Sequence, residues 1–327
     1  MKHVSILVPR GHASVVNIGG AHQILSLVND LARGKGRTAV FDVNLVGLEP
    51  ETRQSTGLFS ISPERLIGEV TRTDLIILPA IHGDPIEAFD RNREFVPWIK
   101  EHYKNGAEVA TFCVGAFFLA QTGLLDGKQC ATHWMHANQF RALFPDVHLV
   151  DDRIMTEEDG VYTSGGAYAF LNLLLYLIEK SAGRDTAILA SKAFSIDIDR
   201  DSQSAFIIFA GQKDHEDEAV IEAQTFIEEH YDEPIRVDEL ADRLALSRRT
   251  LERRFKSATS NTVSEYVQRV KVEAAKKTLE TTRKNIAEVM FNVGYNDTKA
   301  FRTVFRRITG LTPVQYRNKY NREAVVA

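Results

Sequence analysis

The sequence is 327 residues long, with 44% hydrophobic residues, 26% charged residues and a formal net charge of −4. This composition is typical of a globular protein and excludes collagenous and disordered classes, and the length predicts two domains. The longest apolar run, residues 170–178, is too short for a membrane span, and residues 1–8 lack the pattern of a signal peptide. We therefore expect a cytoplasmic protein with no membrane partner.

Short β-like runs alternate with helical stretches from the start of the chain to about residue 194. The expected strands cover residues 4–8, 38–43, 75–78, 107–112 and 160–163. The expected helices cover residues 20–33, 63–70, 95–105, 115–123, 134–144 and 166–182. Apolar strands separated by helices predict a mostly parallel sheet that is covered on both faces. We therefore assign residues 1–198 to a flavodoxin-like α/β sandwich domain.

Residues 199–218 are polar and acidic and show no sustained apolar period, which indicates a linker. Helical periodicity dominates the chain beyond it, in residues 219–230, 236–244, 248–257, 263–280, 286–293 and 298–309. We therefore assign residues 219–320 to an all-α domain and residues 321–327 to a C-terminal tail.

The charge is distributed unevenly between these domains. Residues 247–327 contain 18 Lys and Arg but only 7 Asp and Glu, so this segment carries a net charge of +11 and the preceding residues carry −15. A basic segment in an otherwise acidic protein suits contact with the phosphates of a nucleic acid. On charge alone, a merely solvated basic surface explains the segment equally well.

The all-α domain contains an internal repeat. The series Leu251, Phe255, Thr259, Thr262 and Tyr266 recurs 50 residues later as Phe301, Phe305, Thr309, Thr312 and Tyr316. Each copy has a short helix, a tight turn and a second helix that is opened by a capping residue, Ser247 in the first copy and Asp297 in the second. This pattern predicts two helix-turn-helix units.

The two second helices are the candidate DNA-binding elements. Their apolar residues lie four positions apart and face the core, so the opposite face is left for DNA. On that face lie the candidate DNA-binding residues Arg248, Arg249, Arg253 and Arg254 of the first unit and Thr298, Lys299, Arg302, Thr303 and Arg306 of the second.

The second unit closely resembles the AraC/XylS family of bacterial transcription regulators, over residues 286–295, 300–307 and 310–317. The resemblance extends over residues 219–320 and implies two units, joined by a long helix, that enter successive major grooves of double-stranded DNA. It implies that bases are read by Arg249, Arg253, Thr298, Lys299 and Thr303. It also implies phosphate or solvent contacts for Arg248, Arg254 and Arg306. Val263 departs from the family pattern, which usually has proline at this position.

Cys113 follows an expected strand and precedes an expected helix, in an arrangement like a nucleophile elbow. A helix N-terminus favours the thiolate, and His133 or His136 could accept the thiol proton. A buried structural thiol, a pocket-lining residue and a nucleophile are the alternatives for Cys113.

The cysteines and histidines do not follow a metal-binding pattern. Cys113 and Cys130 are too few for a disulfide framework and lack the spacing of a zinc site. His12, His22 and His82 likewise show no metal spacing. We therefore expect no metal and no cofactor.

Residues 1–195 resemble PfpI-type members of the class I glutamine amidotransferase-like superfamily. The stretch from 123 to 134 is similar to the version of that domain that is fused to AraC-type DNA-binding domains, which implies a regulator rather than an enzyme. Enzymatic members have histidine directly after the cysteine, where this chain has Val114, and an acidic residue where it has Gln23. We therefore expect no catalysis, and a ligand pocket formed by Cys113, Val114, Gln23, His133 and Trp134.

Three functional hypotheses follow from these patterns. The first is a sequence-specific transcription regulator, a homodimer that senses a small-molecule effector through its first domain and contacts double-stranded DNA and RNA polymerase. The second is a cysteine-dependent hydrolase or lyase fused to a DNA-binding domain. The third is a regulator whose first domain only dimerises.

Overall fold

The computed structural model describes residues 1–54, 57–213 and 215–321, so of the expected tail only Asn321 is described. The chain divides into two compact units, Met1–Gln203 (unit 1) and Ser204–Ala327 (unit 2). None of the helices within the described ranges is both long enough and apolar enough to cross a bilayer.

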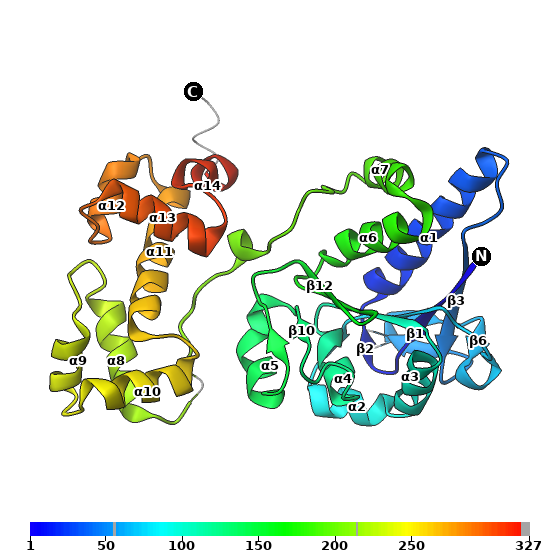
Figure 1. The fold of residues 1–327 in the computed structure, drawn as a ribbon, viewed down its shortest axis with the longest axis horizontal. Helices are drawn as coiled ribbons and strands as arrows, with labels where there is room; N and C mark the ends of the chain where they lie inside the picture. Colours follow the sequence, from blue (N-terminus) through cyan, green and yellow to red (C-terminus); the bar gives the residue numbers. More distant parts are fainter. Residues whose placement is uncertain (55–56, 214, 322–327) are drawn as a thin grey trace. The chain divides into compact units, whose positions relative to one another are not determined.

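Unit 1 is built on one large sheet (Figure 1). Its strands are β1 (Lys2–Val8), β3 (Phe41–Gly47), β6 (Arg65–Leu66), β7 (Leu75–Leu78), β9 (Glu108–Phe112), β12 (Met155–Glu158) and β13 (Val161–Ser164). They lie in the order β12-β13-β9-β7-β1-β3-β6, and neighbours are parallel except for the antiparallel pair β12 and β13. The short pairs are β2 (His12–Ala13) with β8 (Ile81–His82), β4 (Thr52–Gln54) with β5 (Phe59–Ile61), and β10 (Gln129–Cys130) with β11 (His148–Leu149).

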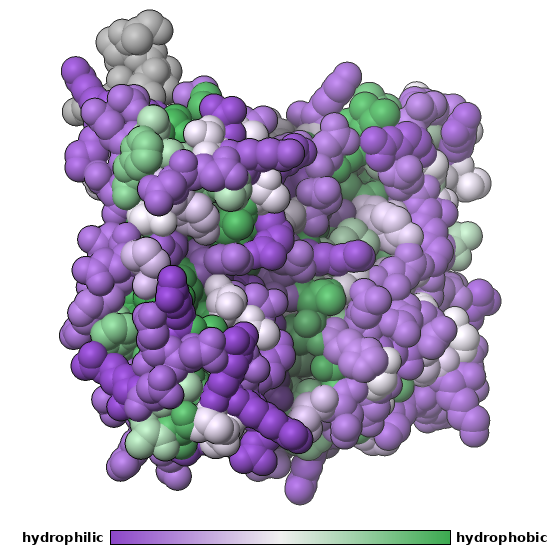
Figure 2. Space-filling view, turned by 60° about the vertical axis from the view of Figure 1, so that its left-hand side comes forward, coloured by the Kyte–Doolittle hydropathy of each residue, from purple (hydrophilic) through white to green (hydrophobic). Residues whose placement is uncertain are grey.

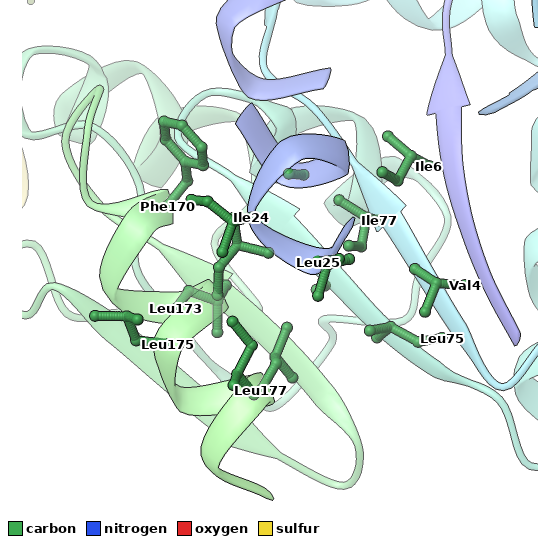
Figure 3. Close-up of a cluster of buried hydrophobic side chains, with 14 of the residues drawn as sticks. Val4, Ile6, Ile24, Leu25, Leu75, Ile77, Phe170, Leu173, Leu175 and Leu177 are labelled. Atoms are coloured by element: carbon green, nitrogen blue, oxygen red, sulfur yellow. The ribbon is translucent and has the colours of Figure 1, made fainter. Parts of the chain in front are cut away.

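Helices cover both faces of this sheet. One face carries α1 (Val15–Gly34), α6 (Phe170–Ala182) and α7 (Arg184–Ala193). The other carries α2 (Pro85–Asn92), α3 (Phe95–Lys104), α4 (Gly115–Gln121) and α5 (Ala137–Leu143). Figure 3 shows how Ile24 and Leu25 of α1 lie between the sheet residue Ile77 and the apolar side of α6. The expected α/β sandwich with a mostly parallel sheet is therefore confirmed.

The helix expected over residues 63–70 is wrong. This segment forms β6 and the 3-10 turn η2 (Ile67–Glu69), because Arg65 and Leu66 pair with the end of β3. Pro63 packs so closely on Gly47 that a Cβ added to Gly47 would lie 2.6 Å from the Cγ of Pro63. The contact holds the segment at the sheet edge. The sequence analysis also did not anticipate α2, α7 and the antiparallel strand β12.

Unit 2 is entirely helical among its described residues. Its helices are α8 (Glu218–Glu229), α9 (Val237–Arg243), α10 (Arg248–Thr259), α11 (Val263–Thr281), α12 (Ile286–Asn292), α13 (Thr298–Thr309) and α14 (Pro313–Tyr320), preceded by the 3-10 turn η4 (Ser204–Phe206). The unit has two apolar cores, and α11 contributes Tyr266 to the first and Leu279 to the second. The expected pair of helix-turn-helix units joined by a long helix is thus present.

The segment expected to be a linker is held on both sides of the boundary between the units. On the unit 1 side, the buried amide of Gln203 accepts a hydrogen bond from Gly166 N at 2.9 Å and donates to the carbonyls of Thr132 at 3.0 Å and Arg153 at 3.1 Å. We call Gln203 the anchor.

On the unit 2 side, residues 204–212, which we call the strap, run along the helices. Lys276 of α11 is buried, and its ammonium donates to the Ile207 carbonyl at 2.6 Å and to Glu273 at 2.6 Å. The same Glu273 carboxylate accepts from Phe209 N at 3.1 Å. Farther along, Gln224 of α8 donates to the Gln212 carbonyl at 2.9 Å. Buried charged groups are costly without partners, so these bonds fix the path of the strap.

Glu108 joins the sheet to α6 through a network of hydrogen bonds. Its carboxylate accepts from Lys180 at 2.9 Å, from the Tyr162 hydroxyl at 2.5 Å and from Lys2. Burial alone would raise the pKa of Glu108, but the hydrogen bonds from Lys180, Lys2 and Tyr162 outweigh it and lower the pKa to about 2.

We expect Glu108→Gln to lower the free energy of unfolding by about 1–2 kcal/mol at neutral pH, after allowance for the partial exposure of the network. Because the folded pKa lies below the ordinary value of 4.5, this contribution is complete above pH 4.5 and is lost as the pH falls from 4.5 toward 2. Urea unfolding at pH 7, 4.5 and 3 measures the difference in free energy of unfolding between wild type and Glu108→Gln. The control is Glu101→Gln, a substitution at an exposed residue of α3. A difference between wild type and Glu108→Gln that does not shrink below pH 4.5 would contradict this role.

Candidate ligand pocket and nucleic-acid interface

Cys113 occupies a sharp turn between β9 and α4. Its φ is +54°, in the left-handed region that residues with side chains seldom adopt. Its amide donates to the Ser164 carbonyl at 3.0 Å, and its carbonyl accepts from the Thr132 hydroxyl at 3.0 Å. A Cβ on Gly115 would lie 2.6 Å from the Pro79 carbonyl oxygen, so only glycine permits this close turn. The elbow expected from the sequence is therefore present.

The expectation that this turn favours the thiolate is wrong. Cys113 is 4% exposed, and burial raises the pKa of its thiol to about 11, although a hydrogen bond from the Val114 amide opposes the rise. The loss of solvation raises the pKa of the thiol by more than the single amide hydrogen bond lowers it. Cys113 is thus a neutral thiol at physiological pH.

The Nδ1 atom of His133 is not free to act as a base. Its Nδ1 accepts a hydrogen bond from Met135 N at 3.2 Å, so the neutral ring carries its proton on Nε2. Burial lowers the pKa of His133, and the charges of His136 and His82 lower it further. Trp134 lies against the His133 ring, with the ring centroids 5.6 Å apart. The arrangement suits a structural or hydrogen-bonding imidazole better than a general base.

A small open pocket lies beside the elbow, and its empty space of about 410 Å³ includes open solvent. Its lining is mostly apolar, with histidines at two places, and includes Ile81, His82, Val114, Phe117, Phe118 and His136. It lies beyond the carboxyl ends of β7 and β9, where open α/β sheets commonly bind ligands.

Of the five residues expected to form a ligand pocket, Val114 lines this one and Cys113 precedes it in the chain. His133 and Trp134 do not line the pocket but lie one turn before the lining residue His136. Gln23 is exposed on α1 and does not belong to the lining. The buried side chain nearer the start of α1 is Asn17, whose Oδ1 accepts from Ala80 N at 3.1 Å.

Sequence reasoning assigned no role to His82, which lines the pocket. The available signal was its position a few residues after the end of β7, because residues that follow neighbouring parallel strands gather at the same sheet edge as Cys113.

We expect Cys113 in a Cys130→Ala protein to react with iodoacetamide more slowly than a free thiol at pH 7.5. Its rate should rise about tenfold per pH unit toward pH 10, because the thiolate fraction does so below the pKa. Mass spectrometry of the alkylated protein measures the rate. The control is Cys113→Ala, which leaves the buried Cys130, whose pKa burial raises to about 12. A rate that levels off below pH 8 would show an activated thiolate instead.

The candidate DNA-binding residues lie on α10 and α13, the second helices of the two helix-turn-helix units. Ser247 caps α10 by accepting from Thr250 N, and Asp297 caps α13 by accepting from Lys299 N, as expected. Leu251 and Phe255 are fully buried on one face of α10, and Phe301 and Phe305 are fully buried on α13. These contacts turn the basic faces outward. In the view of Figure 2, hydrophilic side chains cover most of the surface and hydrophobic ones appear only in separate patches.

The basic residues of α10 differ in the hydrogen bonds and ion pairs that they form within the protein. Arg249 and Arg253 are exposed and make no side-chain hydrogen bond or ion pair with the described residues. Arg248 pairs with Asp238 at 3.1 Å and with Glu252 at 3.0 Å, all on the surface. Arg254 forms a two-pronged ion pair with Asp217, at 2.8 and 2.6 Å. Asp217 also caps α8, so Arg254 is held against the protein and is poorly placed for DNA.

All five candidates on α13 are exposed. Thr298 and Lys299 lie in the first turn, and Arg302, Thr303 and Arg306 follow on the outward face. The side chains of Lys299, Arg302 and Arg306 make no hydrogen bond or ion pair within the described parts of the chain. They are available to phosphates and base edges.

Comparison with known proteins supports this division. Residues 240–319 match the helix-turn-helix domain model, and residues 21–180 match the DJ-1/PfpI family model. The chain is 28% identical over 222 residues to the HTH-type transcriptional regulator ArgR of Pseudomonas aeruginosa. The matched region covers 68% of this chain and 67% of ArgR. It is 25% identical over 260 residues to the regulator CdhR of the same species, and this matched region covers 79% of this chain and 76% of CdhR. The chain is an AraC-type regulator with a DJ-1/PfpI domain.

Unit 1 of the regulator also resembles a solved structure. A transcriptional regulator protein from Vibrio parahaemolyticus matches with a TM-score of 0.52 and 25% identity, over 59% of this chain and 98% of the other. The match agrees with the sandwich built by β1 to β13 and its covering helices.

Proposed function

We propose that the regulator binds specific DNA sequences through unit 2 and that unit 1 senses a small metabolite without catalysing a reaction. The single observation that carries the DNA-binding part is the pair of outward faces on α10 and α13, where Arg249, Arg253, Lys299, Arg302 and Arg306 are exposed without protein partners among the described residues. Two such helices joined by α11 suit two contacts with one duplex.

The sensing part rests on the elbow and its pocket. A neutral, buried Cys113 and a His133 whose Nδ1 is engaged do not provide an activated nucleophile with its base. The pocket beside them combines apolar side chains with two imidazoles and an amide, which suits a small-molecule site. A ligand there regulates DNA binding only if it favours one of two states of the protein.

The proposal keeps the expected organisation, with residues 1–198 as the sensing and dimerising domain, 199–218 as the connection and 219–320 as the DNA-binding domain. A homodimer would present two copies of unit 2 and so raise the affinity for a two-part operator. RNA polymerase in the cytoplasm is the proposed downstream partner.

The test uses the full chain. DNA selected from a random pool first supplies the operator, and its binding is then measured with and without a panel of small polar metabolites. A compound that shifts thermal unfolding, alters operator affinity and is recovered unchanged supports the proposal. Consumption of a compound by wild type but not by Cys113→Ala would establish an enzyme, while DNA affinity that no compound changes would leave unit 1 as a dimerising module.

A further inference from the structure

Four histidines lie in or near the pocket beside Cys113. His12 and His82 face each other in the register of β2 and β8. His133 and His136 belong to the 3-10 turn η3 (Trp134–His136) and its cap, and their ring centroids are 6.0 Å apart. His82 and His136 line the pocket itself. Three chain segments that are distant in sequence thus bring imidazoles to the same part of unit 1.

These imidazoles have no acidic partner among the residues that the structure describes. Within the described parts of the chain, the histidine that forms an ion pair is His3, with Asp42, on another part of the unit. The nearby acidic groups are engaged elsewhere, since Asp84 caps α2 through Ile86 N and Glu87 N, and Glu87 pairs with Arg91. On the side of α5, Arg141 pairs with Asp151. Helix α4 contributes only uncharged side chains.

The lining of the pocket combines two kinds of side chain. Ile81, Ala88, Val114, Phe117 and Phe118 are apolar, whereas His82 and His136 add imidazoles and Gln139 adds a neutral amide. A lining of apolar side chains and imidazoles is complementary to a ligand that has an apolar body and an anionic head.

We propose that this pocket binds a small carboxylate-bearing metabolite, with the hydrocarbon body against Phe117 and Phe118 and the carboxylate held by N–H groups of His82 and His136. This inference rests on the proposed sensing function, because it names the ligand class of the same unit.

Binding is expected to be coupled to protonation. Partial burial lowers the pKa of His82, and the charges of His136 and His12 lower it further, so the empty site favours a neutral His82 ring. A bound carboxylate would favour the charged imidazole and so reverse that effect. Carboxylate affinity should therefore rise as the pH falls from 7.5 to 6, with uptake of protons on binding.

The experiment uses calorimetry with the full chain and four carboxylates, benzoate, phenylacetate, pentanoate and hexanoate, each paired with its neutral amide. We expect at least one acid to bind at least about tenfold more tightly than its amide, with affinity about three- to tenfold higher at pH 6 than at pH 7.5. Titrations in two buffers of different ionisation enthalpy measure the proton uptake. His82→Gln and His136→Gln should each remove the preference for acid over amide, and the exposed His148→Gln of β11 is the matched control.

Several outcomes would overturn the inference. These are failure of all four acids to bind, equal affinity for acid and amide, and a preference that survives both substitutions in variants whose unfolding temperature matches wild type. An amine or neutral metabolite that binds unit 1 and alters operator affinity would reject the carboxylate class and leave the sensing function standing. Operator binding that responds to no compound at all would reject the sensing function itself.

Discussion

Arg253→Ala is expected to weaken binding to the selected operator by about 1–3 kcal/mol, or roughly 5- to 150-fold, and to relax selectivity at one base position. Arg253 lies on the exposed face of α10, and its guanidinium makes no hydrogen bond or ion pair within the described parts of the chain. A bidentate contact to a guanine edge has no substitute when the side chain is shortened. Competition binding with operators mutated at single positions measures both effects.

Two further variants separate base reading from charge. Arg306→Ala of α13 should weaken binding to all sequences alike and reduce the salt slope by about one, as loss of a phosphate contact does. Lys277→Ala removes an exposed positive charge from α11, outside the two recognition helices, and should change affinity little. If Arg253→Ala behaves like Arg306→Ala, Arg253 contacts phosphate and the assignment of base reading is wrong.

Gly294→Ala is expected to destabilise unit 2 by about 3 kcal/mol or more. Gly294 follows α12 with φ +72°, and a Cβ there would lie 2.2 Å from the Asp232 carbonyl oxygen and 2.6 Å from the Lys271 ammonium. The left-handed backbone costs about 1 kcal/mol for alanine, and the overlap with the backbone of Asp232 adds to it. Operator binding should be lost in parallel.

Gly310→Ala is the matched control for this substitution. Gly310 also has a left-handed φ, +74°, but the nearest atom to an added Cβ is the Ser204 Cβ at 4.0 Å. It should cost only the conformational term of about 1 kcal/mol. Circular dichroism follows unfolding of the helices, while tryptophan fluorescence reports on unit 1, which holds both Trp98 and Trp134. Equal destabilisation by both variants would show that the close approach to Asp232 contributes nothing.

Periodicity predicted the helices of unit 2 well because their buried positions carry large apolar side chains at helical spacing. It missed α14, although Thr312 and Gln315 form a capping box and Pro313 occupies the first turn. It also missed α2, where Asp84 caps the helix and Pro85 follows it. Both helices are eight residues long, which is too short for a clear apolar period. The capping residues and the prolines at their first positions were therefore the better indicators of these two helices.

The errors at the site arose where burial decided the chemistry. The spacing around Cys113 predicted the turn, yet the ionisation of the thiol depends on how deeply side chains from other segments enclose it. The role of Gln23 was inferred from its place in the chain, whereas the direction a helical residue faces is set by packing, which leaves Gln23 exposed and Asn17 buried. Arg254 looked like its neighbours because Asp217, which engages it, lies 37 residues away.

The anchor and the strap hold the chain within each unit up to the boundary between Gln203 and Ser204. Gln203 is held inside unit 1 by three hydrogen bonds, and Ala205, two residues later, accepts from the Tyr320 hydroxyl of unit 2 at 3.0 Å. The anchor also bonds Thr132, whose hydroxyl holds the Cys113 carbonyl beside the pocket. An exchange of units between regulators would therefore need to keep Gln203 with unit 1 and residues 204–212 with unit 2, because each stretch is bonded within its own unit.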